Sequence, residues 1–561
     1  MSTRPKIAEA LNEDSLGDVE KYFEELSNVI EDNSGINDFK IVTTDCHSTS
    51  APVKENNYTR FELTDASMDI VDLSKGYINL KISVDLQLKY NDAFKEDWLK
   101  RENQGPTVFF VGFKSASHVI NCYNIYSNNR ITNAKQTKAK YEQTINYICK
   151  SEQERKARPG MYTTWENVMN MSDCVAGAYI YYYDTGSSTP FGKGFDGYGS
   201  ARGVTMDLVI QVDDILPLSA MSYYPRFMFG DLTLELSANV IQNMVFMQVP
   251  PSVVQKRLLA DRNATRTDMF EIPLIDGYID FKFTQCGDYA HGVVCLAEEV
   301  TGGTYQYTGN VPGEGDAKYT IEVSNLVITE AKSFINGFNI KQKSKENLLT
   351  KFQDKPLMIP GQWIEHYNFS QMPTSSNMRC NIILPLWNAS QIIATFPNSS
   401  NQLTVSNNPH LESVQMHIND RILPDKFVTT LDHAHSEMIL NALGLDSLFC
   451  GAPELINSLT YDESKLTGGS RATITRDQSD YMFVANLERF GSGCFCDGMN
   501  AMNCPITLSA NYINGTSNPH YYPYKDGTTR QFSPQNVNLF VVSDCFWVCT
   551  TNGIDLVKDQ M

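Results

Sequence analysis

Residues 77–88 alternate between polar and apolar side chains without interruption. The apolar positions are Ile78, Leu80, Ile82, Val84, Leu86 and Leu88, with Asn79, Lys81, Ser83, Asp85 and Gln87 between them. Because successive side chains of a strand point to opposite faces, this pattern predicts a strand with one buried face. The residues Val204–Val212 and Leu232–Leu236 repeat the alternation. We therefore expect sheets that each bury one face in a core.

Shorter apolar runs predict further strands along the whole chain. These segments are 107–113, 177–183, 319–328, 380–386, 391–396, 413–419, 505–512 and 537–549. Beyond the first 40 residues, helical periodicity is limited to about 136–150, 252–262 and 435–449. Long loops rich in Gly, Ser and Asn occupy 184–203, 301–317 and 462–473. An all-β chain with long connections between short strands favours Greek-key or jelly-roll sandwiches over simple meanders.

The first 40 residues differ from the rest, with ten acidic and four basic side chains. Leu16, Val19, Phe23, Leu26 and Ile30 recur at spacings of three and four, which predicts a helix with one apolar stripe. Two interpretations remain open: the helix packs on its own domain, or it is an arm that docks on a neighbouring subunit.

Charge and cysteine content limit the possible functions. The 46 basic and 65 acidic residues give a net charge of −19, which repels phosphate backbones and argues against direct nucleic-acid binding. The polar start predicts no secretory signal, and no apolar run is long enough for a transmembrane segment. We therefore expect a reducing compartment, in which the 13 cysteines are free thiols.

The best metal candidate is a group of cysteines near the end of the chain, namely Cys494, Cys496, Cys504, Cys545 and Cys549. The spacing of the first two is not that of a zinc knuckle, and no histidine lies near them. Cys545 and Cys549 flank an apolar, strand-like segment and are more simply interpreted as core thiols. His433 and His435 beside Glu437 begin an expected helix, where residues two apart diverge.

Catalytic motifs are also missing from the sequence. The stretch 491–494 has the composition of a nucleophile elbow but does not join a strand to a helix. The glycines of 192–199 lie in a polar loop and match no phosphate-binding motif. We therefore predict no catalytic, cofactor-binding or metal-binding residues and no cofactor, and we expect a structural protein rather than an enzyme.

Two further features carry alternatives. Tyr181, Tyr182 and Tyr183 could stack on sugars, so an intracellular β-sandwich carbohydrate-binding protein or glycoside hydrolase is the competing hypothesis. The Gly468-Gly469 pair is similar to the short sites cut by adenovirus-type maturation proteases, but an exposed Gly/Ser turn is the favoured interpretation.

The succession of strand-like phrases in 61–84, 108–132, 207–236, 319–340, 355–387 and 408–424 resembles the major capsid proteins of the Polinton/Maverick and adintovirus lineage. The resemblance covers roughly 60–550, preserves the order of the blocks and leaves the N-terminal helix outside it.

The resemblance implies a double jelly roll, with two tandem eight-stranded sandwiches per chain, a short N-terminal helix and a few loop helices. It implies homotrimers that tile an icosahedral shell around double-stranded DNA. The location would be the virion, which assembles inside the host cell. The partners would be neighbouring trimers, pentons and other minor capsid proteins. The expected divisions are 1–40 for the acidic helical arm, 41–250 for the first jelly roll, 251–315 for the connection and 316–561 for the second jelly roll.

Overall fold

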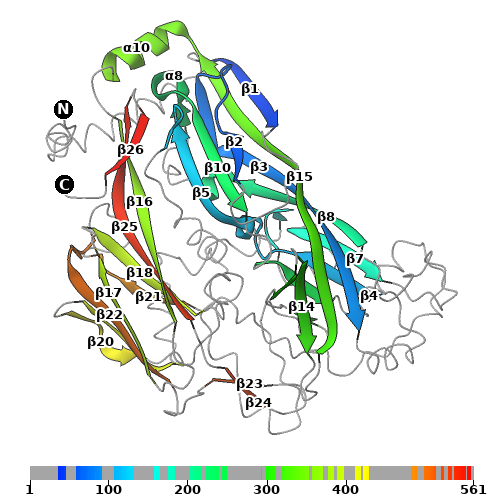
Figure 1. The fold of residues 1–561 in the computed structure, drawn as a ribbon. Helices are drawn as coiled ribbons and strands as arrows, with labels where there is room; N and C mark the ends of the chain where they lie inside the picture. The colour runs from blue at the N-terminus through cyan, green and yellow to red at the C-terminus, as the bar shows by residue number, and fades with distance from the viewer. Residues whose placement is uncertain are drawn as a thin grey trace.

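In a computed structural model of the chain, two β-sandwiches lie side by side and α10 (Gln342–Phe352) lies between them in the sequence (Figure 1). The structure describes residues 36–45, 58–90, 107–131, 157–158, 160–163, 175–182, 202–215, 223–238, 243–248, 292–293, 298–301, 304–310, 317–352, 357–370, 377–384, 388–396, 411–418, 421–428, 482–488, 498–512, 520–523, 529–532, 536–550 and 553–557. Strands dominate these residues, so the all-β prediction is confirmed.

The first sandwich has one large sheet. Its main strands lie in the order β1, β15, β3 and β8, with bounds Ile36–Asp45, Ala317–Ile340, Ile70–Tyr90 and Arg202–Gln211. The short strand β9 (Tyr223–Pro225) also pairs with β3. β14 (Thr304–Asn310) pairs with the first part of β15, and β13 (Glu298–Thr301) pairs with β14. β1 pairs with the last part of β15. We call this sheet the β3–β15 sheet.

The opposite layer of the first sandwich consists of two smaller sheets. One has the order β2, β10, β5 and β6, with bounds Tyr58–Glu62, Leu232–Ala238, Ile120–Ser127 and Arg130–Ile131. The other has the order β12, β11, β4 and β7, with bounds Gly292–Val293, Val245–Gln248, Thr107–Gly112 and Gly177–Tyr182. Two chain segments, β4 followed by β5 and β10 followed by β11, each contribute one strand to each of these sheets. The segment β4–β5 thus runs antiparallel to β10–β11.

The second sandwich repeats this plan more simply. One sheet has the order β16, β25, β18 and β21, with bounds Leu357–Ser370, Asn536–Thr550, Ala389–Thr395 and Met482–Asn486. The facing sheet has the order β17, β22, β19 and β20, with bounds Asn377–Leu384, Cys504–Tyr512, Leu411–Ile418 and Arg421–Val428. β26 (Gly553–Val557) folds back on β25, and β23 (His520–Pro523) pairs with β24 (Thr529–Phe532).

The pairing in both sandwiches is nested, so that the first main strand pairs with the last and each inner pair follows the same rule. In the first sandwich the nested pairs are β1 with β15, β2 with β10, β3 with β8, and β4 with β7. In the second they are β16 with β25, β17 with β22, β18 with β21, and β19 with β20. Eight strands paired in this way and split between two facing sheets form a jelly roll. The prediction of a double jelly roll is confirmed.

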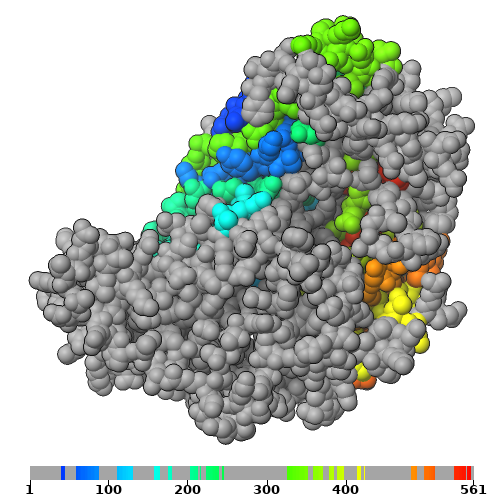
Figure 2. Space-filling view, turned by 180° about the vertical axis from the view of Figure 1, so that it is seen from behind, coloured from blue at the N-terminus to red at the C-terminus, as the bar shows by residue number. Residues whose placement is uncertain are grey.

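The alternating segments form the core as predicted. Ile78, Ile82 and Val84 of β3 are fully buried, as are Met206 and Leu208 of β8. The polar residues between them lie on the outer face of the β3–β15 sheet, which Figure 2 shows in the blue of β3, the green of β15 and the teal of β8. One apolar face therefore packs inward and one polar face remains accessible.

The predicted domain boundary at 315/316 is wrong. β15 lies between β1 and β3 and contributes Ala331, Ile335 and Phe338 to the first core, so the first sandwich ends at Ile340 and the second begins at Leu357. The long segment 249–316 before β15 suggested that β15 begins a new domain. Its partner β3 lies far upstream in the sequence, and no local pattern indicates this pairing. Residues 36–40, assigned to the arm, belong to β1. The helices expected in 1–35, 136–150, 252–262 and 435–449 lie outside the described residues.

Candidate functional site

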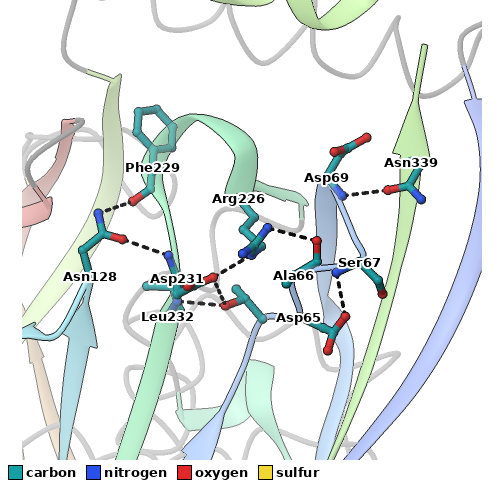
Figure 3. Close-up of polar contacts among 11 residues, drawn as sticks. Asp65, Ala66, Ser67, Asp69, Asn128, Arg226, Phe229, Asp231, Leu232 and Asn339 are labelled. Atoms are coloured by element: carbon teal, nitrogen blue, oxygen red, sulfur yellow. Dashed lines mark hydrogen bonds and ion pairs between the residues drawn. The ribbon is translucent and has the colours of Figure 1, made fainter. Parts of the chain in front are cut away.

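One end of the first sandwich is closed by a network of polar side chains, which we call the closed end. It joins three connections: 64–69 between β2 and β3, 128–129 after β5, and 226–231 between β9 and β10 (Figure 3). Arg226 donates from Nε to Asp231 Oδ1 over 2.6 Å and from Nη1 to the carbonyl of Ala66 over 3.4 Å. Thr64 Oγ1 accepts the amide of Leu232 at 3.0 Å. These bonds hold the connections together at the end of the core.

Asn128 is the second fixed point of the closed end. Its backbone has φ of 50°, a left-handed conformation that Asn tolerates better than most residues. Its side chain donates to the carbonyl of Phe229 at 3.0 Å and accepts the amide of Asp231 at 3.0 Å. Gly230 lies between these two residues with φ of 81°. The side-chain amide of Asn128 therefore binds the turn before β10 on both sides of Gly230.

Asp69 connects the closed end to α10. Its amide donates to Asn339 Oδ1 at 3.1 Å, and its Oδ2 accepts the amide of Ile340 at 3.1 Å. Its Oδ1 is 2.6 Å from the ammonium of Lys345, on the first half of α10. The carboxylate thus fixes the last residue of β15 and the helix that follows it.

The two sandwiches share buried apolar contacts. Ile359, Cys545, Trp547, Cys549 and Ile554 of the second sandwich belong to the same buried cluster as the core of the first. At the margin of this junction, Arg130 is 3.8 Å from Asp555, and both side chains are at least half exposed. Such an exposed pair contributes about 0–1 kcal/mol, so the apolar cluster dominates the junction.

Two titratable side chains of the shared cluster, Tyr224 and Cys549, are held in their protonated form. Burial raises the pKa of Tyr224 well above its usual value, and burial likewise raises the pKa of Cys549. Both groups therefore remain protonated at physiological pH. The indole Nε1 of Trp547 is buried and has no hydrogen-bond partner among the described residues, so this side chain contributes through packing.

The outer face of the β3–β15 sheet carries a ladder of charges. Glu330 Oε2 accepts from Lys81 Nζ at 2.7 Å, its other oxygen pairs with Lys332, and Asn79 donates to Asp207 at 2.6 Å. The hydrogen bonds from Lys332 and then Lys81 lower the pKa of Glu330 to about 2. All three members of the central group are about one-third exposed, which gives an ordered, accessible polar surface.

Large apolar side chains that are exposed are few among the described residues: Ile41, Tyr58, Leu349, Ile383 and Ile422. Ile41 lies on β1, and Tyr58 on β2. Ile383 and Ile422 lie on β17 and β20 of the second sandwich. These positions are dispersed over several faces, so each is a candidate contact point for a partner rather than part of a ligand pocket.

Those sequence-based candidates that lie in the described part of the chain are not brought together into a site. Cys545 and Cys549 are buried core thiols of β25, as expected, and Cys504 lies at the start of β22. Within the described part of the chain, no three His, Cys, Asp or Glu side chains are placed to hold a metal. Tyr181 and Tyr182 lie on β7. Tyr183, Cys494, Cys496, His433, His435, Glu437 and the stretches 184–201, 468–469 and 491–494 lie outside the described residues.

The closed-end residues were not predicted. Adjacent asparagines at 128–129 and the Gly230-Asp231 dipeptide are turn signals that could have located two of its connections.

No helix in the described ranges has the length and apolar character needed to cross a membrane.

Comparison with known proteins gives structural matches only. No family model and no curated protein sequence matches the chain. The fold is similar to the crystal structure of the mavirus major capsid protein, with 8% identity, a TM-score of 0.47 and coverage of 94% of this chain and 91% of that one. It is also similar to a chain of the Sputnik virophage structure (8%, 0.46, 94% and 90%) and to the Faustovirus major capsid protein (7%, 0.41, 91% and 90%).

Proposed function

We propose that this chain is a non-enzymatic major capsid protein, of the Polinton/Maverick kind, that forms homotrimers and tiles an icosahedral shell around double-stranded DNA. The observation that carries the proposal is the same nested eight-strand pairing in two consecutive sandwiches of one chain. Jelly rolls are a recurrent architecture of viral capsid proteins. Because each chain supplies two similar units, a ring of three chains presents six, the outline that packs in a hexagonal lattice.

The junction supports this use of the fold. The buried contacts of Trp547, Cys549 and Ile554 with the first core join both sandwiches into one block. A block that keeps its shape can make the same lateral contacts in every copy. Contacts between different faces of one chain close into rings when the rotation allows it, which limits growth until other contacts engage.

Charge supports the assignment of partners. A net charge of −19 suits a shell whose contact with the genome is made by other, basic proteins. The proposed partners are neighbouring trimers, pentons and other minor capsid proteins. The proposed location is the virion, with assembly inside the host cell.

Light-scattering mass of the purified chain is the first test. One chain has a mass of 63.1 kDa, so a trimer has three times 63.1, or about 189 kDa. We expect this mass, together with hexagonal particles or shells in negative-stain images of the same fractions. A monomer or dimer without such particles, combined with specific binding on a glycan array, would replace the proposal with the carbohydrate-binding alternative.

A further inference from the structure

Helix α10 presents an exposed face on the closed end of the first sandwich. Its inner side is fixed by Leu348, which is 3% exposed in the first core, and by the Lys345–Asp69 ion pair of 2.6 Å. On the opposite side Lys343 and Glu346 are exposed, and Leu349 is 41% exposed. This outer face combines an apolar side chain with one exposed lysine and one exposed carboxylate, and Lys341, just before the helix, is also exposed.

The basic character of this region contrasts with the rest of the chain. Residues 341–351 contain four lysines and one acidic residue, Glu346, and so carry a net charge of +3 in a chain whose total is −19. An acidic, amphipathic segment is the chemistry that would match such a face.

Strand register places one such segment next to α10. Ile36, the first residue of β1, pairs with Ile340, the last residue of β15, and the two strands are antiparallel. The chain therefore enters β1 at the end where β15 leaves toward α10, and Figure 1 shows α10 beyond this end of the two strands. Ile36 therefore lies opposite a residue only two positions before Gln342, the first residue of the helix.

The preceding sequence has the matching composition. Residues 1–35 contain nine acidic and three basic side chains, and the apolar stripe ends at Ile30. The six residues from Ile30 to Ile36 can span about 20 Å when extended. The eleven residues of α10 extend over only about 16 Å, so the end of the stripe can reach any part of the exposed face.

We propose that the outer face of α10 is the docking surface for residues 13–32 of the same chain, with Leu349 covered by the apolar stripe and Lys343 paired with its acidic side chains. The short tether favours the same chain, because a short linker gives an effective concentration in the millimolar range (roughly 1 mM). The proposal concerns the folded monomer and does not depend on capsid assembly.

Zero-length carbodiimide cross-linking of the full chain tests the proposal directly. We expect mass spectrometry to find amide links from Lys343 to acidic residues within 13–32. Mixing ¹⁵N-labelled with unlabelled protein before cross-linking identifies the chain of origin. Links within one isotopic species support the proposal, whereas mixed-isotope links, or none to α10, overturn it.

Hydrogen exchange gives an independent test that uses a matched variant. The double variant Leu349→Ser with Lys343→Glu changes exposed positions only and should accelerate exchange of residues 16–30 by about tenfold, because docking protects amides only while it persists. Ile383→Ser, at a site 68% exposed on β17, is the control and should leave exchange of this segment unchanged. Equal exchange in the wild type and the double variant would refute the docking.

Discussion

The rings of Tyr77 and Phe334 stack with centroids 4.4 Å apart and planes 13° apart, across the paired strands β3 and β15. Tyr77 precedes the alternating core segment of β3, and Phe334 lies in the half of β15 that also pairs with β1. The stack therefore marks the centre of the β3–β15 sheet and shows why β15 belongs to the first sandwich.

Truncation tests this boundary. A fragment of residues 34–355 contains every main strand of the first sandwich and is expected to unfold cooperatively in urea. A fragment of residues 34–315 lacks the strand between β1 and β3 and should show no cooperative transition by circular dichroism, because β1 loses its only described partner strand. Equal cooperativity of the two fragments would contradict the assignment of β15.

Local patterns predicted the strands, whereas the partners of the strands could not be predicted. The burial of Ile78, Ile82 and Val84 follows from a period of two that is visible in the sequence. The ion pair of Lys81 with Glu330 joins residues 249 positions apart, and no local pattern specifies which distant strand lies alongside. α10 was missed because its single fully buried residue among the described ones, Leu348, gives too weak a stripe against its lysines.

The closed end of the first sandwich was unpredictable for a related reason. Asn128 bonds to Phe229 and Asp231, which are about 100 positions away, so the network exists only once the sandwich has formed. Sequence signals can indicate that 128–129 is a turn, but they cannot identify which other turn it meets. The absence of catalytic motifs, by contrast, was a direct reading of the sequence.

Gly230→Ala should destabilise the first sandwich strongly. The backbone at this position has φ of 81°, and a Cβ there would be 1.8 Å from Oδ1 of Asn128. The left-handed conformation costs a non-glycine residue about 1–2 kcal/mol, and displacement of the Asn128 side chain removes two hydrogen bonds of about 1 kcal/mol each. We expect a loss of about 3 kcal/mol in the free energy of unfolding, measured by urea denaturation.

Gly203→Ala is the matched control for this prediction. A Cβ at Gly203 would be 3.3 Å from the Asp85 carboxylate, which can move, and the position has no positive φ. Its effect should be below about 1 kcal/mol, as for most surface substitutions. Similar losses in both variants would show that the closed end does not depend on the Asn128 contacts.

Glu330→Gln should weaken the protein in a pH-dependent manner. Hydrogen bonds from Lys332 and Lys81 lower the pKa of Glu330 to about 2, below its value in the unfolded chain. A lowered folded-state pKa contributes stability that is present above the unfolded pKa and is lost as the pH falls through the folded one. The stability difference between wild type and variant should therefore be constant near pH 7 and shrink between about pH 4 and pH 2.

Urea denaturation at several pH values measures this difference, with Glu346→Gln on α10 as the control. Glu346 accepts a hydrogen bond from Gln342 at 3.2 Å and is exposed. The stability difference between wild type and Glu330→Gln should also decrease at 1 M salt, where the Debye screening length is about 3 Å. A difference that remains unchanged down to pH 2 would exclude the ladder as its source.

Alkylation should separate the cysteines by burial. Burial raises the pKa of Cys380 to about 12, and it also raises that of Cys549, so both are protonated at pH 8. Because the thiolate is the nucleophile, a rise in the pKa of Cys380 from 9.0 to about 12 slows its alkylation at pH 8 by about 10³-fold even before access is considered.

Among the five described cysteines, Cys122 and Cys504 are half-buried and should react with iodoacetamide before the other three, as mapped by mass spectrometry of tryptic peptides. Cys380, Cys545 and Cys549 should react only after urea unfolds the chain, because all three are 0% exposed. Their labelling at the rate of Cys122 in native buffer would show that the sandwich cores open on the timescale of the reaction. Protection of Cys380 combined with labelling of Cys545 and Cys549 would instead localise the opening to the junction between the two sandwiches, where both thiols pack against the first core.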